Sequence, residues 1–148
     1  MSRPGSIAIA ALLLATFAGP GWSGDATALI AEGEANLKAG EIDAGLNRFR
    51  QAVEQDPSSS LAQTRVGGAL LLKQEYQPAI EAFRSAIMLD GANADAFIGM
   101  AMAYLHSGDY ALARASLEEA KRIDPAKQDK IDEVIAYIDQ REAGGGSH

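Results

Sequence analysis

His106 and Asp109 are the residues of this chain whose types and spacing most resemble acid–base chemistry. A histidine held by a carboxylate can accept and return a proton near neutral pH, which is the basis of general acid–base catalysis. The pair stands in the stretch LHSGDYALA, residues 105–113, and the other histidine of the chain is its last residue, His148. Whether the pair forms a catalytic site depends on the elements that carry it.

The composition already excludes several classes of protein. A chain of 148 residues with 47% hydrophobic and 22% charged residues suits one globular domain. It contains no cysteine, which excludes disulfides, thiolate catalysis and cysteine zinc sites. A net charge of −7 argues against nucleic acid as a partner, because nucleic-acid-binding proteins present a basic face. We expect no cofactor and no metal.

The first residues have the three-part pattern of a secretory signal peptide. Arg3 precedes an uninterrupted apolar run at residues 7–19, and small residues and turn formers follow it. Thirteen helical residues span about 20 Å, which is shorter than the roughly 30 Å hydrocarbon core of a bilayer. The pattern predicts a signal peptide at residues 1–24, cleaved near 23–26, and a periplasmic or secreted protein. An uncleaved membrane anchor is the alternative.

A repeat of 34 residues organises the rest of the chain. Several independent positions recur at this spacing without any insertion, which indicates a repeat architecture. The recurring sets are Asp56, Asp90 and Asp124; Phe49, Phe83 and Leu117; Ala52, Ala86 and Ala120; Gly33, Gly67 and Ala101; and Gly45, Ala79 and Ala113.

Each repeat has the pattern of two helices. In the third repeat, Phe97, Met100, Ala101 and Tyr104 lie at the spacing of one helical face, and a second such stripe begins at Tyr110. Small residues at the recurring glycine and alanine positions let the two helices approach closely. The large residues of the phenylalanine set are predicted to fill the space between successive repeats. One helix pair cannot cover its own apolar face, so the pairs must stack.

This helix–turn–helix pattern resembles the tetratricopeptide repeat (TPR) family, as an exported bacterial-type member. The resemblance covers nearly all of residues 25–142 and implies an all-α solenoid with units at 26–59, 60–93 and 94–127. Gly91 stands where the family has proline, which predicts a less rigid junction between the second and third units. The apolar stripe that begins at Ile131 predicts a capping helix at residues 128–142, followed by a flexible tail at 143–148.

The repeat gives His106 and Asp109 a structural interpretation. They lie in the turn between the two helices of the third unit, and Asp109 is equivalent to Glu41 and Glu75 in the other two units. An acid is favoured at the start of a helix by the helix dipole. The other two acids have no histidine beside them. We therefore expect a structural role for the pair and no enzymatic activity.

The resemblance to TPR proteins also implies a binding groove on the concave side, formed by the first helix of each unit. Its predicted residues are Ile30, Glu34, Leu37, Leu61, Thr64, Arg65, Gly68, Leu71, Ile98, Met102 and Leu105. The set is mostly apolar, which favours an apolar or amphipathic polypeptide segment as the ligand. It departs from the family's carboxylate-binding groove, because Arg65 is the one cation of the set. The terminal helix or a second copy of the chain is the alternative occupant.

Together these patterns predict a non-enzymatic scaffold or adaptor of the cell envelope that binds another protein. The alternative is a self-associating structural subunit, or an accessory assembly factor of a secretion, pilus or cytochrome-maturation system. In both cases we expect no membrane contact after cleavage of the signal peptide.

Overall fold

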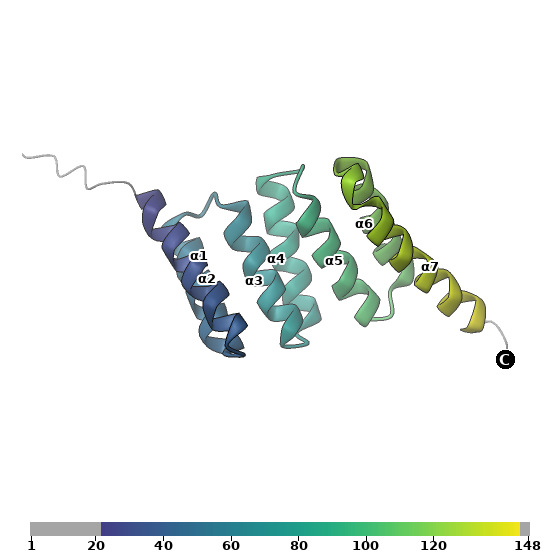
Figure 1. The fold of residues 1–148 in the computed structure, drawn as a ribbon, viewed down its shortest axis with the longest axis horizontal. Coiled ribbons are helices and arrows are strands. Elements are labelled where there is room, and N and C mark those ends of the chain that lie inside the picture. Colours follow the sequence, from purple (N-terminus) through teal and green to yellow (C-terminus); the bar gives the residue numbers. More distant parts are fainter. Residues whose placement is uncertain (1–21, 146–148) are drawn as a thin grey trace, which may run out of the picture.

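The computed structural model of the chain describes residues 22–145 (Figure 1), with side chains from Asp25 onward. The predicted signal peptide falls almost entirely outside the described residues, as does the end of the predicted tail. The elements, in chain order, are α1 (Trp22–Lys38), α2 (Ile42–Gln55), α3 (Ser60–Leu72), α4 (Tyr76–Leu89), α5 (Ala94–His106), α6 (Tyr110–Ile123), a short 3₁₀ helix η1 (Pro125–Lys127) and α7 (Gln128–Gly145).

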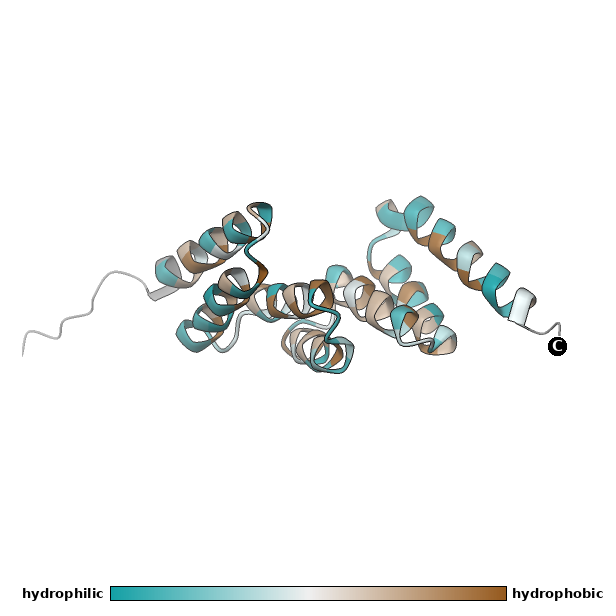
Figure 2. Ribbon diagram, turned by 90° about the horizontal axis from the view of Figure 1, so that it is seen from below, coloured by the Kyte–Doolittle hydropathy of each residue, from teal (hydrophilic) through white to brown (hydrophobic). Residues whose placement is uncertain are grey.

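The described residues contain helices and no strands, which confirms the all-α solenoid. The helices lie side by side in chain order (Figure 1). In the second view the row bends, with α1 and α7 at its two raised ends and α4 on the outer side of the bend (Figure 2). Helices α3 and α5 begin at Ser60 and Ala94, where the predicted second and third units start. Helix α7 continues to Gly145, three residues past the predicted end of the capping helix.

The repeated aspartates explain why the second helix of every pair ends where it does. The backbone N–H groups of Asp56, Asp90 and Asp124 donate to the carbonyls four residues earlier, each at 2.9 Å. Their carboxylates then accept the backbone N–H two residues further on, at 3.1, 2.9 and 3.2 Å respectively. These side-chain bonds form a turn that mimics a backbone turn. The same turn forms at all three junctions, including the one where Gly91 replaces proline.

The turns within the helix pairs need a residue in the left-handed conformation. Gly40 and Gly108 supply it at φ of 79° and 80°. In the second unit the equivalent residue is Gln74, which adopts a φ of 62°. A side chain in this region is strained, whereas glycine is not. The fold therefore imposes its turn on a sequence that is poorly suited to it.

Two aromatic rings fill the space that the small residues leave. Phe49 is fully buried, and its ring packs against Gly33 of the same unit. Phe83 is 2% exposed, and its ring packs against Gly67 within its own unit and Gly99 in the next. The ring of Phe83 therefore closes both its own helix pair and the junction to the third unit. The sequence predicted only the second of these roles.

Candidate functional site

The structure gives both members of the candidate acid–base pair a structural position. The Asp109 carboxylate accepts the backbone N–H of Leu112 at 3.3 Å, which caps the start of α6. The His106 ring stacks on Tyr76 of α4, with ring centres 5.4 Å apart and planes 6° apart. Among residues 22–145, no three histidine or acidic side chains are grouped as a metal site would require. No helix in this part of the chain has the length and hydropathy needed to span a bilayer.

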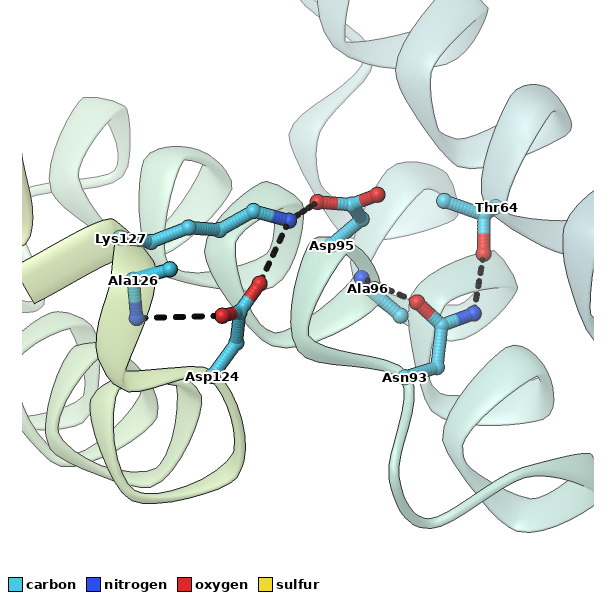
Figure 3. A network of polar contacts seen from close by, with 7 residues as sticks. All are labelled: Thr64, Asn93, Asp95, Ala96, Asp124, Ala126 and Lys127. Carbon is cyan, nitrogen blue, oxygen red and sulfur yellow. Dashed lines mark hydrogen bonds and ion pairs between the residues drawn. The ribbon is translucent and has the colours of Figure 1, made fainter.

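The predicted groove residues of the first two units include two that are already committed to the core. Ile30 and Thr64 are only 8% and 7% exposed, so they offer little surface to a ligand. The Thr64 hydroxyl donates to the Ser60 carbonyl at 2.8 Å. It also accepts from the Asn93 amide at 2.9 Å (Figure 3). Since the Asn93 side chain also accepts from the backbone of Ala96 at 2.9 Å, this network fixes the start of α5 against α3.

The two charged residues in this part of the predicted groove form an ion pair with each other. Arg65 of α3 donates through Nε to Oε1 of Glu34 in α1 at 2.6 Å, with both side chains partly exposed. The one cation in the predicted groove therefore already has a carboxylate. A peptide carboxylate would have to displace Glu34 in order to bind Arg65.

The remaining predicted residues of α1 and α3 make a shallow surface. Leu37 and Leu71 are half-buried and pack against the core, whereas Leu61 is 48% exposed. Nothing lies within 4 Å of a Cβ placed on Gly68, so that position is open. The most exposed predicted surface of the first two units is therefore Leu61 and the space beside Gly68, with Leu37 and Leu71 partly accessible.

The three predicted residues of the third unit line a deeper feature, which we name the α5–α7 cleft. One part has a volume of about 530 Å³ and lies between Met102 and Leu105 of α5 and Val134 and Tyr137 of α7. A second part of about 270 Å³ is lined by Ile98, Met102, Ile131 and Val134 among others. Both parts share Met102 and Val134, so they adjoin each other and are treated as one cleft. The capping helix therefore forms one wall of the predicted groove.

Helix α7 is held in place by apolar contacts and by ion pairs to the third unit. Ile131 and Ile138 are 2% and 0% exposed and belong to the core formed with α5 and α6. The pairs that reach α7 join Arg114 to Asp139 and Glu142, and Lys121 to Asp132 at 2.7 Å. Just before α7, Lys127 of η1 pairs with Asp95 of α5 at 2.6 Å. Figure 3 shows Lys127 between the carboxylates of Asp95 and Asp124. These contacts anchor α7 on α6, and its C-terminal end diverges from the stack (Figure 1), which leaves the α5–α7 cleft open.

The ion pairs also perturb the lysines that form them. The pKa of Lys121 is raised above its ordinary value, mainly by its hydrogen bond to Asp132. The pKa of Lys127 is raised mainly by its hydrogen bond to Asp95, with Asp124 adding to the effect. Both lysines stay charged at neutral pH, so the ion pairs of α7 and η1 are not sensitive to pH in that range.

A second cleft, which we name the α4–α6 cleft, was not predicted. It has a volume of about 660 Å³, with Phe97, Met100 and Tyr104 of α5 among its lining residues. Met88 and Leu112 stand at its sides and are 87% and 45% exposed.

A comparison of equivalent positions in the three units would have revealed the α4–α6 cleft from the sequence. The residues 34 before Met88 and Phe97 are Glu54 and Gln63, and the residue 34 after Met88 is Arg122. The first junction between units is therefore polar where the second is apolar. Met88 and Leu112 are exposed around the same cleft, and a contiguous exposed apolar patch is a sign of an interaction surface.

Comparisons with known proteins match this architecture. Two profiles described as tetratricopeptide repeat match residues 30–96 and 70–136, which together cover well over half of the chain. Protein bimA of Emericella nidulans is 29% identical over 84 residues, which are 57% of this chain and 10% of that protein. The chain thus spans a small part of the length of this relative.

Solved structures share the fold at low sequence identity. The first TPR domain of the human RPAP3 protein is 18% identical with a TM-score of 0.78, over 84% of this chain and 98% of that one. The first TPR of Spaghetti (RPAP3) bound to the HSP90 peptide SRMEEVD is 18% identical with a TM-score of 0.77, over 82% and 95% of the two chains. The TPR2B domain of yeast Sti1 in a complex with pHsp70 is 20% identical with a TM-score of 0.76, over 79% and 98%.

Proposed function

The chain belongs to the tetratricopeptide repeat family, and we propose that it is an adaptor whose α5–α7 cleft binds an apolar segment of another polypeptide. The observation that carries this proposal is the pair of apolar walls, Met102 and Leu105 on one helix and Val134 and Tyr137 on the other, with open space between them. A cleft with apolar walls on two helices suits a peptide that inserts apolar side chains between them. The peptide can be extended, with every second side chain apolar, or an amphipathic helix. Structural neighbours that hold peptides support a role in protein interaction.

The ligand that we propose is not an acidic peptide tail bound across α1 and α3, because that surface does not offer free cations. Arg65 is already paired with Glu34, and Ile30 and Thr64 are buried. The first two units offer Leu61 and the open position at Gly68 in place of a cluster of cations. For this reason we assign the binding function to the third unit and the capping helix.

The location that we propose is the cell envelope, after removal of a signal peptide. The support is the pattern of Arg3, the apolar run at 7–19 and the small residues that follow. The mass of the protein purified from its own cells tests this directly. A new N-terminus within residues 24–27 agrees with the proposal, and a retained Met1 contradicts it.

Self-association is the second candidate function, and the α4–α6 cleft favours it. Met88 is 87% exposed beside an apolar floor, and the rim charges Glu81 and Arg84 pair with each other at 3.5 Å. This locally neutral patch lies on a chain of net charge −7, whose copies repel one another elsewhere. Light scattering during size exclusion tests it, because a monomer at high protein concentration contradicts it.

Capture of a partner from envelope extract tests the adaptor function. The bait is the purified chain, compared with Met102→Asp, which places a charge in the α5–α7 cleft. The control is Met88→Glu, which places a charge in the α4–α6 cleft and copies the residue of the first unit. We expect the partner to be lost with Met102→Asp and kept with Met88→Glu. A partner that is kept by Met102→Asp contradicts the proposal.

A further inference from the structure

We propose that the α5–α7 cleft selects segments with an acidic residue on each side of an apolar stretch, a specificity that rests on the binding function proposed above. The inference concerns the charges at the ends of the cleft. Its apolar walls alone do not determine which residue type is preferred at each position of a bound peptide. Two basic side chains on α7, Lys130 and Arg141, carry it.

These two cations lack the carboxylate partners that their neighbours have. Within residues 94–145, each of the other arginine and lysine side chains has a carboxylate within 4 Å, and those residues are Arg114, Lys121, Arg122 and Lys127. Neither Lys130 nor Arg141 has an ion pair in this part of the chain, and both line the α5–α7 cleft. In a chain of net charge −7, cations left without a partner beside an apolar cleft are available to an acidic ligand.

The positions of the two cations define the two ends of the ligand. They are eleven residues apart on one helix, which corresponds to roughly 16 Å along its axis. An extended peptide covers that length in about five residues. Glu133 also lines the cleft, three residues after Lys130, so a second acidic ligand residue just inward of the Lys130 end is disfavoured. The charge pattern therefore favours acidic residues at the ends and apolar residues in the middle.

Arg141 is held in position for such a contact. Its guanidinium lies over the Tyr137 ring, with Cζ 5.2 Å from the ring centre. A cation–π contact of this kind restrains the side chain and leaves the N–H groups at the guanidinium edge free to donate to a carboxylate. Tyr137 thus contributes both to the apolar wall and to the position of the cation.

A selection from a random peptide library on the immobilised full chain tests the proposal. The variants are the charge reversal Lys130→Glu with Arg141→Glu and a control reversal, Lys38→Glu with Arg50→Glu. Lys38 and Arg50 are exposed residues of the first unit without an ion pair in the described residues, so both variants change the net charge equally. Met102→Asp shows whether a selected peptide binds in the cleft.

The expected result is a set of peptides with apolar centres and acidic flanks. Their affinity should fall roughly tenfold in the Lys130→Glu, Arg141→Glu variant, because two exposed charge contacts are reversed. It should be unchanged in the control reversal and should weaken with added salt. Peptides that lose binding in Met102→Asp but have neutral or basic flanks overturn the charge selectivity and leave the adaptor function standing. An absence of enriched peptides, or enrichment unaffected by Met102→Asp, overturns both.

Discussion

The ring of Phe83 in α4 packs directly on the backbone of Gly99 in α5, so that a Cβ placed on Gly99 would lie 2.3 Å from two ring carbons. This contact joins the second unit to the third, and the α5–α7 cleft is built on the third. We expect Gly99→Ala to destabilise the protein by about 1–3 kcal/mol, because the buried ring has no room to move away. Urea unfolding measures the effect.

The matched control is Gly68→Ala in α3, where nothing lies within 4 Å of the added Cβ. This change removes a glycine from a helix without a clash, so stability should rise by up to about 1 kcal/mol. Opposite signs for the two glycine substitutions support the observed packing between units. A destabilising Gly68→Ala would show that α3 faces a neighbour that the structure does not place there.

The turn at Gln74 offers a second test of the fold. Gln74 has a φ of 62°, whereas Gly108 occupies the equivalent turn of the third unit at 80°. Replacing Gln74 with glycine should raise stability by about 0.5–1 kcal/mol, because the left-handed conformation is no longer strained. The reciprocal change Gly108→Gln should lower it by a similar amount. Heat unfolding of the two variants measures both, and equal signs would contradict the assigned turns.

The ion pairs that hold α7 and η1 should depend on pH in the alkaline range. Asp132 and Asp95 raise the pKa of Lys121 and Lys127 above the ordinary lysine value near 10.5. A raised pKa in the folded state stabilises the protein below the unfolded value, and this stabilisation is lost as the pH rises through the folded value. The variant Asp95→Asn with Asp132→Asn should therefore unfold at a lower temperature than the native chain at pH 8. That difference should shrink above pH 11, and a constant difference would contradict the ion pairs.

Much of the fold could be predicted from the sequence because the repeat fixes several positions at once. The recurring positions each have one role in all units. The position of Phe83 packs the core, that of Asp90 forms a turn, and that of Ala86 lets helices approach closely. The side chain of Gln74 does not favour its left-handed conformation, and only its place in the repeat between Gly40 and Gly108 indicates it. The turn is instead imposed by the packing of the two helices that it connects.

The candidate site could be predicted only in part, because the ligand-contacting positions of the TPR family lie in the repeat units and not in the capping helix. Ile98, Met102 and Leu105 were predicted and do line a cleft, whereas Ile30 and Thr64 are buried. The opposite wall of the cleft comes from α7, whose placement depends on contacts such as Lys121 with Asp132 that a periodic pattern does not specify. Whether these residues bind a ligand stays a prediction.

The methionines allow the two clefts to be observed separately. Met102 lines the α5–α7 cleft, and Met88 and Met100 line the α4–α6 cleft. If copies of the chain associate through the α4–α6 cleft, the methyl resonances of Met88 and Met100 should shift as the protein is diluted without ligand. The Met102 methyl should stay constant in that series. A dilution series that moves Met102 alone would place self-association in the other cleft.

The most direct measurement is a titration of the methyl-¹³C-methionine chain with a library-selected peptide, followed by NMR. We predict that the Met102 methyl resonance shifts in proportion to the bound fraction, while those of Met88 and Met100 do not move. A shift of the Met88 or Met100 resonance that saturates with added peptide, while the Met102 resonance stays unchanged, would contradict binding in the α5–α7 cleft.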